Sequence, residues 1–175
     1  MKYFKKEMWI APNFGTDEEA EQADAEWVLN LAEYEKQLEQ LRPRLSSNAS
    51  KFFGKIHLHD GTLLSFSVGD ALDSTEEIPL KKRKTRVRMV VTSIDNGATY
   101  ILNYSGLRHV NVDFPSDKPL FWELGDSFDD WGYDELTDAG DGFFRHEILF
   151  ASGATIAIEF QHFKYNRLTK KKNNV

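Results

Sequence analysis

The chain has 175 residues, no cysteine and a net charge of −6. This length suits one sizeable domain, and the lack of cysteine excludes disulfides, thiolate nucleophiles and zinc–thiolate sites. No stretch is apolar for long enough to form a membrane helix, and the first residues lack the apolar run of a secretory signal. We therefore expect a soluble, cytoplasmic protein.

The charge is unevenly distributed along the chain. Residues 16–41 carry nine acidic side chains and one lysine, and residues 113–142 carry ten acidic side chains and one lysine. These blocks sum to −17, so the remainder carries a net +11 to reach −6 overall. Such asymmetry predicts complementary faces within the fold or towards a partner.

A helix is predicted from Asp17 to Leu41. Thr16 and Glu19 have the spacing of a capping box, and Arg42-Pro43 ends the helix because a residue before proline is disfavoured in the α conformation. One apolar stripe recurs at three- and four-residue steps and is expected to pack onto the sheet of the chain. Its members are Ala20, Ala23, Trp27, Leu31, Tyr34, Leu38 and Leu41.

After this helix the apolar residues alternate with polar ones, which is typical of strands. Strands are expected at 52–58, 64–68, 87–91, 100–104, 107–114, 144–150 and 155–163. Asn96-Gly97 and Ser152-Gly153 are turn signals between successive strands. The sequence therefore predicts an α+β fold, with one long N-terminal helix packed on an antiparallel, roughly seven-stranded sheet or partly closed barrel.

The chain is expected to form one domain over 1–175. Its parts are an N-terminal helical segment (1–45), a β-rich region (50–165) and a flexible basic tail (166–175). Two segments interrupt the strands, at 69–84 and 115–142. The second mixes carboxylates with aromatic residues, and we expect it to be an ordered functional loop.

The sequence I-H-L-H-D-G-T places two histidines two residues apart, directly before Asp60-Gly61. In a strand that ends in a bulged turn at this glycine, His57 and His59 share the polar face. The principal interpretation is this strand and turn. The alternative is a metal-dependent enzyme whose candidate ligands are His57, His59, Asp60 and His146.

The acidic-aromatic loop supplies the candidate partner-binding residues. Aromatic side chains provide buried area at interfaces, and carboxylates attract a basic partner. The predicted set is Trp122, Asp126, Asp129, Asp130, Trp131, Tyr133, Asp134 and Glu135. This pattern predicts a protein partner with a basic surface, and no membrane.

Other motifs point less clearly to a function. The sequences G-x-x-x-x-G-K-[ST], G-x-G-x-x-G and G-x-S-x-G are absent, and we expect no cofactor and no catalytic residues. A second alternative is nucleic-acid binding through the basic segment 81–88, but no aromatic platform accompanies it. The run at 170–172 is also basic.

Several short motifs resemble those of a bacterial family of unknown function. They are M-K-Y-F-K-K-E at the start, L-H-D-G-T-L-L-S, Y-D-E at 133–135, F-x-H-E-I-L-F at 144–150 and I-x-I-E-F at 156–160. The resemblance implies small cytoplasmic proteins, some acting as immunity or accessory factors beside toxins, and it brings no enzymatic activity. It emphasises His59, Asp60, Tyr133, Asp134, Glu135, His146 and Gly153. The leading hypothesis is therefore a non-enzymatic protein that binds a protein partner.

Overall fold

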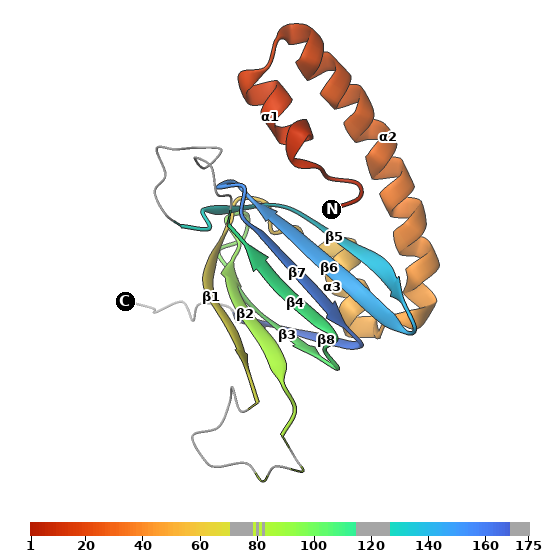
Figure 1. Cartoon of the computed structure of the whole chain (residues 1–175), viewed down its shortest axis with the longest axis vertical. Coiled ribbons are helices and arrows are strands. Elements are labelled where there is room, and N and C mark those ends of the chain that lie inside the picture. Colours follow the sequence, from red (N-terminus) through yellow and green to blue (C-terminus); the bar gives the residue numbers. More distant parts are fainter. Residues whose placement is uncertain (71–78, 80, 82, 115–126, 169–175) are drawn as a thin grey trace.

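The computed structural model of the chain describes residues 1–70, 79, 81, 83–114 and 127–168. The helices are α1 (Lys6–Phe14), α2 (Asp17–Leu41), the 3₁₀ helix η1 (Arg42–Arg44) and α3 (Ser47–Lys55). The strands are β1 (Gly61–Gly69), β2 (Arg86–Thr92), β3 (Thr99–Ser105), β4 (His109–Asp113), β5 (Asp130–Gly140), β6 (Phe143–Phe150), β7 (Thr155–Phe160) and β8 (His162–Leu168). The predicted α+β class is confirmed, with helices first and an antiparallel sheet after them (Figure 1).

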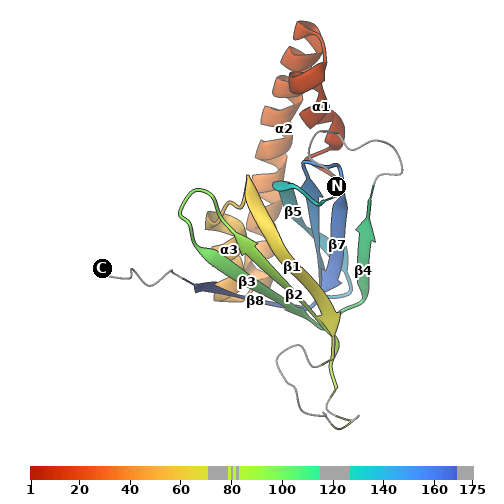
Figure 2. The ribbon, with the colours of Figure 1, turned by 90° about the vertical axis from the view of Figure 1, so that its left-hand side faces the viewer.

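Helix α2 begins and ends where the sequence predicts. The Thr16 hydroxyl accepts a hydrogen bond from the Glu19 N–H, and the Glu19 carboxylate accepts one from the Thr16 N–H. The C-terminal part of α2 packs on the buried core through Tyr34, Leu38 and Leu41, and Trp27, nearer its middle, contacts Tyr133 of β5. The N-terminal half of α2 pairs with α1, and this helical hairpin extends past the end of the sheet (Figures 1 and 2).

Helix α3 occupies a segment for which a strand was predicted, at 52–58, so that prediction was wrong. The Ser46 side chain accepts a hydrogen bond from the Ala49 N–H and caps the helix. Ala49, Phe52 and Phe53 then lie on one buried face, at helical spacing. The apparent alternation of Phe52, Ile56 and Leu58 spans the end of this helix and the irregular residues after it.

The eight strands form one antiparallel sheet in the order β4-β7-β6-β5-β1-β2-β3-β8, and the sheet is not closed. Strands β1 and β5 pair only through Gly61 with Trp131 and Thr62 with Asp130. Beyond these pairs the two halves of the sheet separate. The other junction lies where β7 continues into β8, at Gln161, whose N–H contacts the carbonyl oxygens of Ser105 and Gly106.

The turns predicted at Asn96-Gly97 and Ser152-Gly153 are confirmed, and a third turn joins β5 to β6. The single strand predicted at 155–163 is two strands, β7 and β8, which separate at Gln161. With β5 in place of the strand predicted at 52–58, this division gives eight strands instead of seven. Gly97 joins β2 to β3 and Gly153 joins β6 to β7, both with positive φ. Asp141 and Gly142 also have positive φ, at 53° and 82°, as a tight hairpin between β5 and β6 requires. The segment expected as a loop up to residue 142 is therefore a strand from Asp130 onwards.

The sheet folds back on itself around a common core. Tyr104 of β3 and His146 of β6 are not on neighbouring strands, yet the Tyr104 hydroxyl lies 2.8 Å from His146 Nδ1. Helix α3 fills the space between the halves, because Phe53 contacts the ring of His146 on one side and the ring of Phe163 on the other. The core thus links both halves of the sheet to α3.

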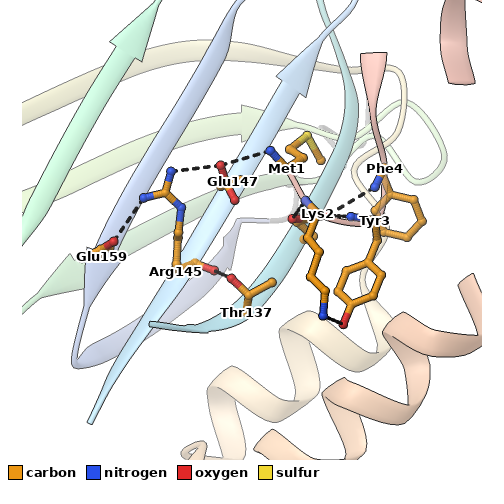
Figure 3. A network of polar contacts seen from close by, with 9 residues as sticks. Met1, Lys2, Tyr3, Phe4, Thr137, Arg145, Glu147 and Glu159 are labelled. Atoms are coloured by element: carbon orange, nitrogen blue, oxygen red, sulfur yellow. Dashed lines mark hydrogen bonds and ion pairs between the residues drawn. The ribbon is translucent and has the colours of Figure 1, made fainter. Parts of the chain in front are cut away.

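A polar network on the outer side of β5, β6 and β7 holds the first residues of the chain (Figure 3). Arg145 lies between the carboxylates of Glu147 and Glu159, at 3.0 and 3.1 Å, and the Met1 amino group lies 3.3 Å from Glu147. The Glu159 carboxylate also accepts a hydrogen bond from Arg108, at 2.7 Å. The network therefore links β4, β6 and β7 to the N-terminal segment.

The C-terminal strand extends into the segment expected to be a tail. Strand β8 continues to Leu168, so the segment from 166 begins as strand, and 169–175 lie outside the described residues.

Within the described part of the chain, none of the helices combines the length and the apolar character needed to cross a bilayer.

Substituting Glu159→Gln tests the network through its pH dependence. The hydrogen bond from Arg108 and the charge of Arg145 hold the pKa of Glu159 below its usual value. A lowered pKa means that this carboxylate stabilises the fold above the unfolded-state pKa, and that the stabilisation is lost as the pH falls through the folded-state pKa. Urea unfolding at neutral pH should show a loss of about 1 kcal/mol, which disappears in acid.

Glu39→Gln is the matched control, because Glu39 pairs with Arg42 on the exposed surface of α2. Its effect on unfolding free energy should be close to zero at every pH. Equal effects of the two substitutions at neutral pH would contradict a stabilising role of the network.

Candidate functional site

An open cleft of about 580 Å³ lies between the helical hairpin and the free edge of β5. Helices α1 and α2 form one wall, and residues 53–59 form the other. The bulge at the start of β5 forms the floor. The lining residues are Phe4, Met8, Pro12, Ala23, Asp24, Trp27, Leu31, Tyr34, Phe53, Ile56, His57, Leu58, His59, Gly132, Tyr133 and Asp134.

The cleft exists because β1 leaves β5 after two residue pairs. Helix α2 then covers part of the unpaired strand edge. The Tyr34 hydroxyl accepts a hydrogen bond from the Leu136 N–H, at 3.1 Å, and the Gln37 side chain donates to the Leu136 carbonyl, at 3.2 Å. Nearer the start of β5, α2 no longer covers the strand edge directly, and the cleft lies between the helix and the strand.

Aromatic rings from four parts of the chain meet beside the cleft. The Tyr133 ring lies 4.7 Å from Trp27, 5.1 Å from Trp9 and 5.4 Å from His59, measured between centroids. His59 stacks nearly parallel on Tyr133 and donates its Nδ1–H to the Gly132 carbonyl, at 2.7 Å. These contacts hold the Tyr133 ring between residues of α1, α2 and the segment before β1.

The aromatic cluster is extended by Phe4, which the N-terminal segment brings to the same place. Phe4 lies 4.9 Å from Trp27 and 5.2 Å from Tyr34. The segment is held by the buried carboxylate of Glu135, which accepts hydrogen bonds from the backbone N–H groups of Lys2, Tyr3 and Phe4. A charge-assisted arrangement of this kind is strong, so Glu135 positions one side of the cleft.

At the floor of the cleft, Asp134 is tied to the buried core. Its Oδ1 accepts a hydrogen bond from Trp131 Nε1, at 2.9 Å, and its Oδ2 lies 3.0 Å from His146 Nε2. On the other side of the imidazole, Nδ1 lies 2.8 Å from the Tyr104 hydroxyl. Burial, together with the charge of Asp134, raises the pKa of Tyr104 well above its usual value, so this tyrosine keeps its proton.

The protonated hydroxyl of Tyr104 is used to assign the direction of the hydrogen bonds from Tyr104 to His146 and from His146 to Asp134. We assign the Tyr104 hydroxyl as the donor to His146 Nδ1 and the Nε2–H of the imidazole as the donor to Asp134. Asp134 thus accepts hydrogen bonds from Trp131 and His146, and no Lys or Arg among the described residues forms an ion pair with it. Its side chain is 25% exposed and borders the cleft. The site therefore presents a fixed negative charge among aromatic rings.

More carboxylates gather beside the cleft, at the junction of β1 and β5. Burial, followed by the charges of Asp129 and Asp60, raises the pKa of Asp130. Burial and then Asp60 raise the pKa of Tyr133. One carboxylate oxygen of Asp129 is buried and accepts no hydrogen bond within the described part of the chain. These effects indicate a crowded negative potential around the site.

The predicted partner-binding residues fall into three groups. Trp122 and Asp126 lie outside the described residues. Trp131 and Glu135 are fully buried, so their side chains support the site from behind. Tyr133 and Asp134 line the cleft. Asp129 and Asp130 lie at the start of β5, beside the cleft. A role of these residues in partner binding stays a prediction.

The predicted metal ligands are not brought together. His57, His59 and Asp60 are exposed on the irregular segment between α3 and β1, which corrects the expected strand and hairpin at this point. His146 is buried in the core, with both ring nitrogens engaged. In the described portion of the molecule, no group of three or more His, Asp or Glu side chains has an arrangement suited to a metal ion.

The basic segment 81–88 leads into β2, where Arg86 and Arg88 pair with Gly69 and Ser67 of β1. It does not contribute to the lining of the cleft. Residue 82 lies outside the described residues, and nucleic-acid binding by this segment stays a prediction.

Sequence reasoning missed several residues of the site. Trp27 and Tyr34 belong to the predicted apolar stripe of the helix and do face β5, but the stripe does not indicate a cleft, and no motif points to Phe4, Trp9 or Tyr104. One signal was present in α2, since a 25-residue helix is longer than the strands that it was expected to cover. Among the residues emphasised by the family resemblance, His59, Tyr133 and Asp134 line the cleft, and His146 lies directly behind its floor.

Comparison with known proteins gives little further information. No family model matches the chain, and no curated protein matches it at a significant level. Among solved structures it is similar to an uncharacterized protein from Neisseria gonorrhoeae, with 13% identity and a TM-score of 0.44, over 64% of this chain and 95% of that chain. These comparisons identify neither a family nor a function, so the function is inferred from the site.

Substituting Gly132→Ala tests the packing at the floor of the cleft. A Cβ there would lie 1.8 Å from the Trp9 ring and 2.8 Å from the Leu149 carbonyl oxygen. Because the strand carbonyl cannot move freely, Trp9 must be displaced, and we expect a loss of about 1–3 kcal/mol in urea unfolding. Gly54→Ala in α3 is the control, since its Cβ meets only an arginine side chain at 3.4 Å. An unchanged stability for Gly132→Ala would show that Trp9 does not pack here.

Substituting Tyr104→Phe tests the buried chain of hydrogen bonds. It leaves His146 Nδ1 without its partner in the core, and we expect a loss of about 1–3 kcal/mol in unfolding free energy. Tyr100→Phe is the matched control, because the hydroxyl of Tyr100 accepts a hydrogen bond from the exposed Asn96, where water can take its place. The control should cost less than the substitution at Tyr104. Equal costs would contradict the role assigned to the buried pair.

Proposed function

We propose that this is a cytoplasmic bacterial protein that binds a basic protein partner through the acidic-aromatic face, which comprises Asp60, Asp129, Asp130, Tyr133 and Asp134. The observation that carries the proposal is the meeting of these carboxylates beside a cleft with aromatic walls. Aromatic anchors and charged neighbours are what a protein interface uses for affinity and for steering.

The free protein carries an electrostatic cost at this face. The raised pKa of Asp130 means that its charged form is less favourable in the folded protein than in water. The contribution of Asp130 to the stability of the fold is therefore present at low pH, and it is lost as the pH rises through the folded-state pKa. Basic side chains of a partner would offset the repulsion that Asp129 and Asp60 exert on Asp130.

The sharper form of the proposal is an immunity or accessory protein that covers a basic toxin. A protein that acts on nucleic acid presents Lys and Arg to the phosphate backbone. An acidic face is complementary to such a surface and can block it. The charge argument supports this partner class, and the resemblance to a family with immunity-type members points in the same direction.

Substituting Asp130→Asn separates binding from folding. Because the pKa of Asp130 is raised, removal of its charge should leave the free protein equally or more stable at neutral pH, as measured by its melting temperature. The same substitution, combined with Asp60→Asn, should weaken partner binding about tenfold or more. Binding should also weaken as salt concentration rises.

The partner for this measurement is found by affinity capture, then purified, and its affinity is measured by calorimetry. Asp95→Asn is the control, since Asp95 is an exposed carboxylate in the β2–β3 turn, outside the acidic-aromatic face. A purified partner that binds the Asp60/Asp130 variant as tightly as the wild type would overturn the proposal. Protection of cells that express a toxin would test the immunity form directly.

A further inference from the structure

We propose that the cleft receives an arginine side chain of the basic partner, with the guanidinium group over the aromatic rings and paired with Asp134. This inference rests on the proposed function and specifies what the partner inserts. Its structural basis is a carboxylate fixed at the floor of the cleft between aromatic walls from α2 and β5.

The charge of Asp134 is available to a ligand. Trp131 and His146 each donate one hydrogen bond to a different carboxylate oxygen. Each oxygen of a carboxylate has a second acceptor direction, and the Asp134 side chain is 25% exposed, so it keeps the capacity to accept from a donor in the cleft. Asp24 is also in the lining, so the described lining holds two carboxylates and neither Lys nor Arg. A cation is the complementary occupant.

The walls of the cleft favour a cation that is only weakly hydrated. Trp27 and Tyr133 line the cleft with their centroids 4.7 Å apart, and Phe4 lies 4.9 Å from Trp27. The faces of such rings attract cations, most strongly when water is removed. Met8 and Leu31 add apolar surface to the same wall. The site thus combines an aromatic surface with one fixed charge.

Arginine fits these features better than lysine does. Its guanidinium group is planar and stacks on aromatic faces, and it donates two parallel hydrogen bonds to one carboxylate. Lysine carries a more strongly hydrated point charge, which loses more on entering a cleft with aromatic walls. A cleft of about 580 Å³ is open enough to admit the side chain together with part of the peptide that carries it.

The test is a titration of the full-length protein with three capped tripeptides, Gly-Arg-Gly, Gly-Lys-Gly and Gly-citrulline-Gly, monitored by the NMR signals of the tryptophan indoles. Citrulline has nearly the shape of arginine without its charge. We expect the arginine peptide to bind about tenfold more tightly than the citrulline peptide, and more tightly than the lysine peptide. Equal affinity for the arginine and citrulline peptides would overturn the inference.

Variants locate the bound peptide. Asp134→Asn should remove the preference for arginine over citrulline, and Trp27→Leu should weaken binding of the arginine peptide while leaving the two hydrogen bonds of Asp134 in place. The second variant keeps the test valid if the first fails to fold. Asp95→Asn should bind like the wild type. Unchanged arginine binding by a folded Trp27→Leu protein would contradict the assignment to this cleft.

A further arm separates a protein-borne arginine from a small cation. Tetramethylammonium that binds as tightly as the arginine peptide would overturn the inference in favour of a small-molecule site. The two proposals also fail separately. A purified partner that depends on Asp60 and Asp130, without any binding of the arginine peptide, would overturn only this inference. If the arginine peptide binds, but a purified partner binds the Asp60/Asp130 variant as tightly as the wild type, only the proposed function is overturned.

Discussion

The buried carboxylate of Glu135 is the interaction on which the arrangement of the site depends. It accepts three successive backbone N–H groups and so fixes the N-terminal segment against β5. Because the N–H of Phe4 is one of these three groups, the Phe4 ring is held beside Trp27 and Tyr34. Helix α1 follows directly, and its Trp9 packs on Gly132. One carboxylate thus organises the wall of the cleft that lies farthest from the core.

The neighbouring residue, Asp134, faces the opposite side of β5 and serves a different purpose. Adjacent strand positions point to opposite faces, so Glu135 organises the exterior while Asp134 contacts the core through Trp131 and His146. The link through His146 to Tyr104 joins the cleft to the far half of the sheet. A change in the charge of Asp134 would therefore act on the buried hydrogen bonds of His146 and Tyr104.

Local signals predicted those parts of the fold that local interactions decide. The capping box at Thr16 and the proline at 43 fixed the bounds of α2, and the glycines at 97 and 153 fixed two turns. The prediction was wrong for α3, where Phe52 was assigned to a strand. Phe52, Ile56 and Leu58 fit the alternation of a strand, while Ala49, Phe52 and Phe53 have the spacing of a helix, and both patterns share Phe52. The prediction was also wrong for β5, whose Gly and Asp residues have low strand propensity and are held in the strand by pairing with β6.

For the site, the sequence by itself determined which types of residue are present: clustered carboxylates, aromatic residues at 131 and 133, and a histidine pair before a turn. It could not determine their directions, since a bulge at Gly132 sets which of Trp131, Tyr133 and Asp134 face the core. Only the tertiary structure buried Trp131, separated His146 from His59, and brought Phe4 and Trp27 to Tyr133. The physical reason is that these contacts join residues distant in the chain, and their free energy comes from packing and burial that no local pattern encodes.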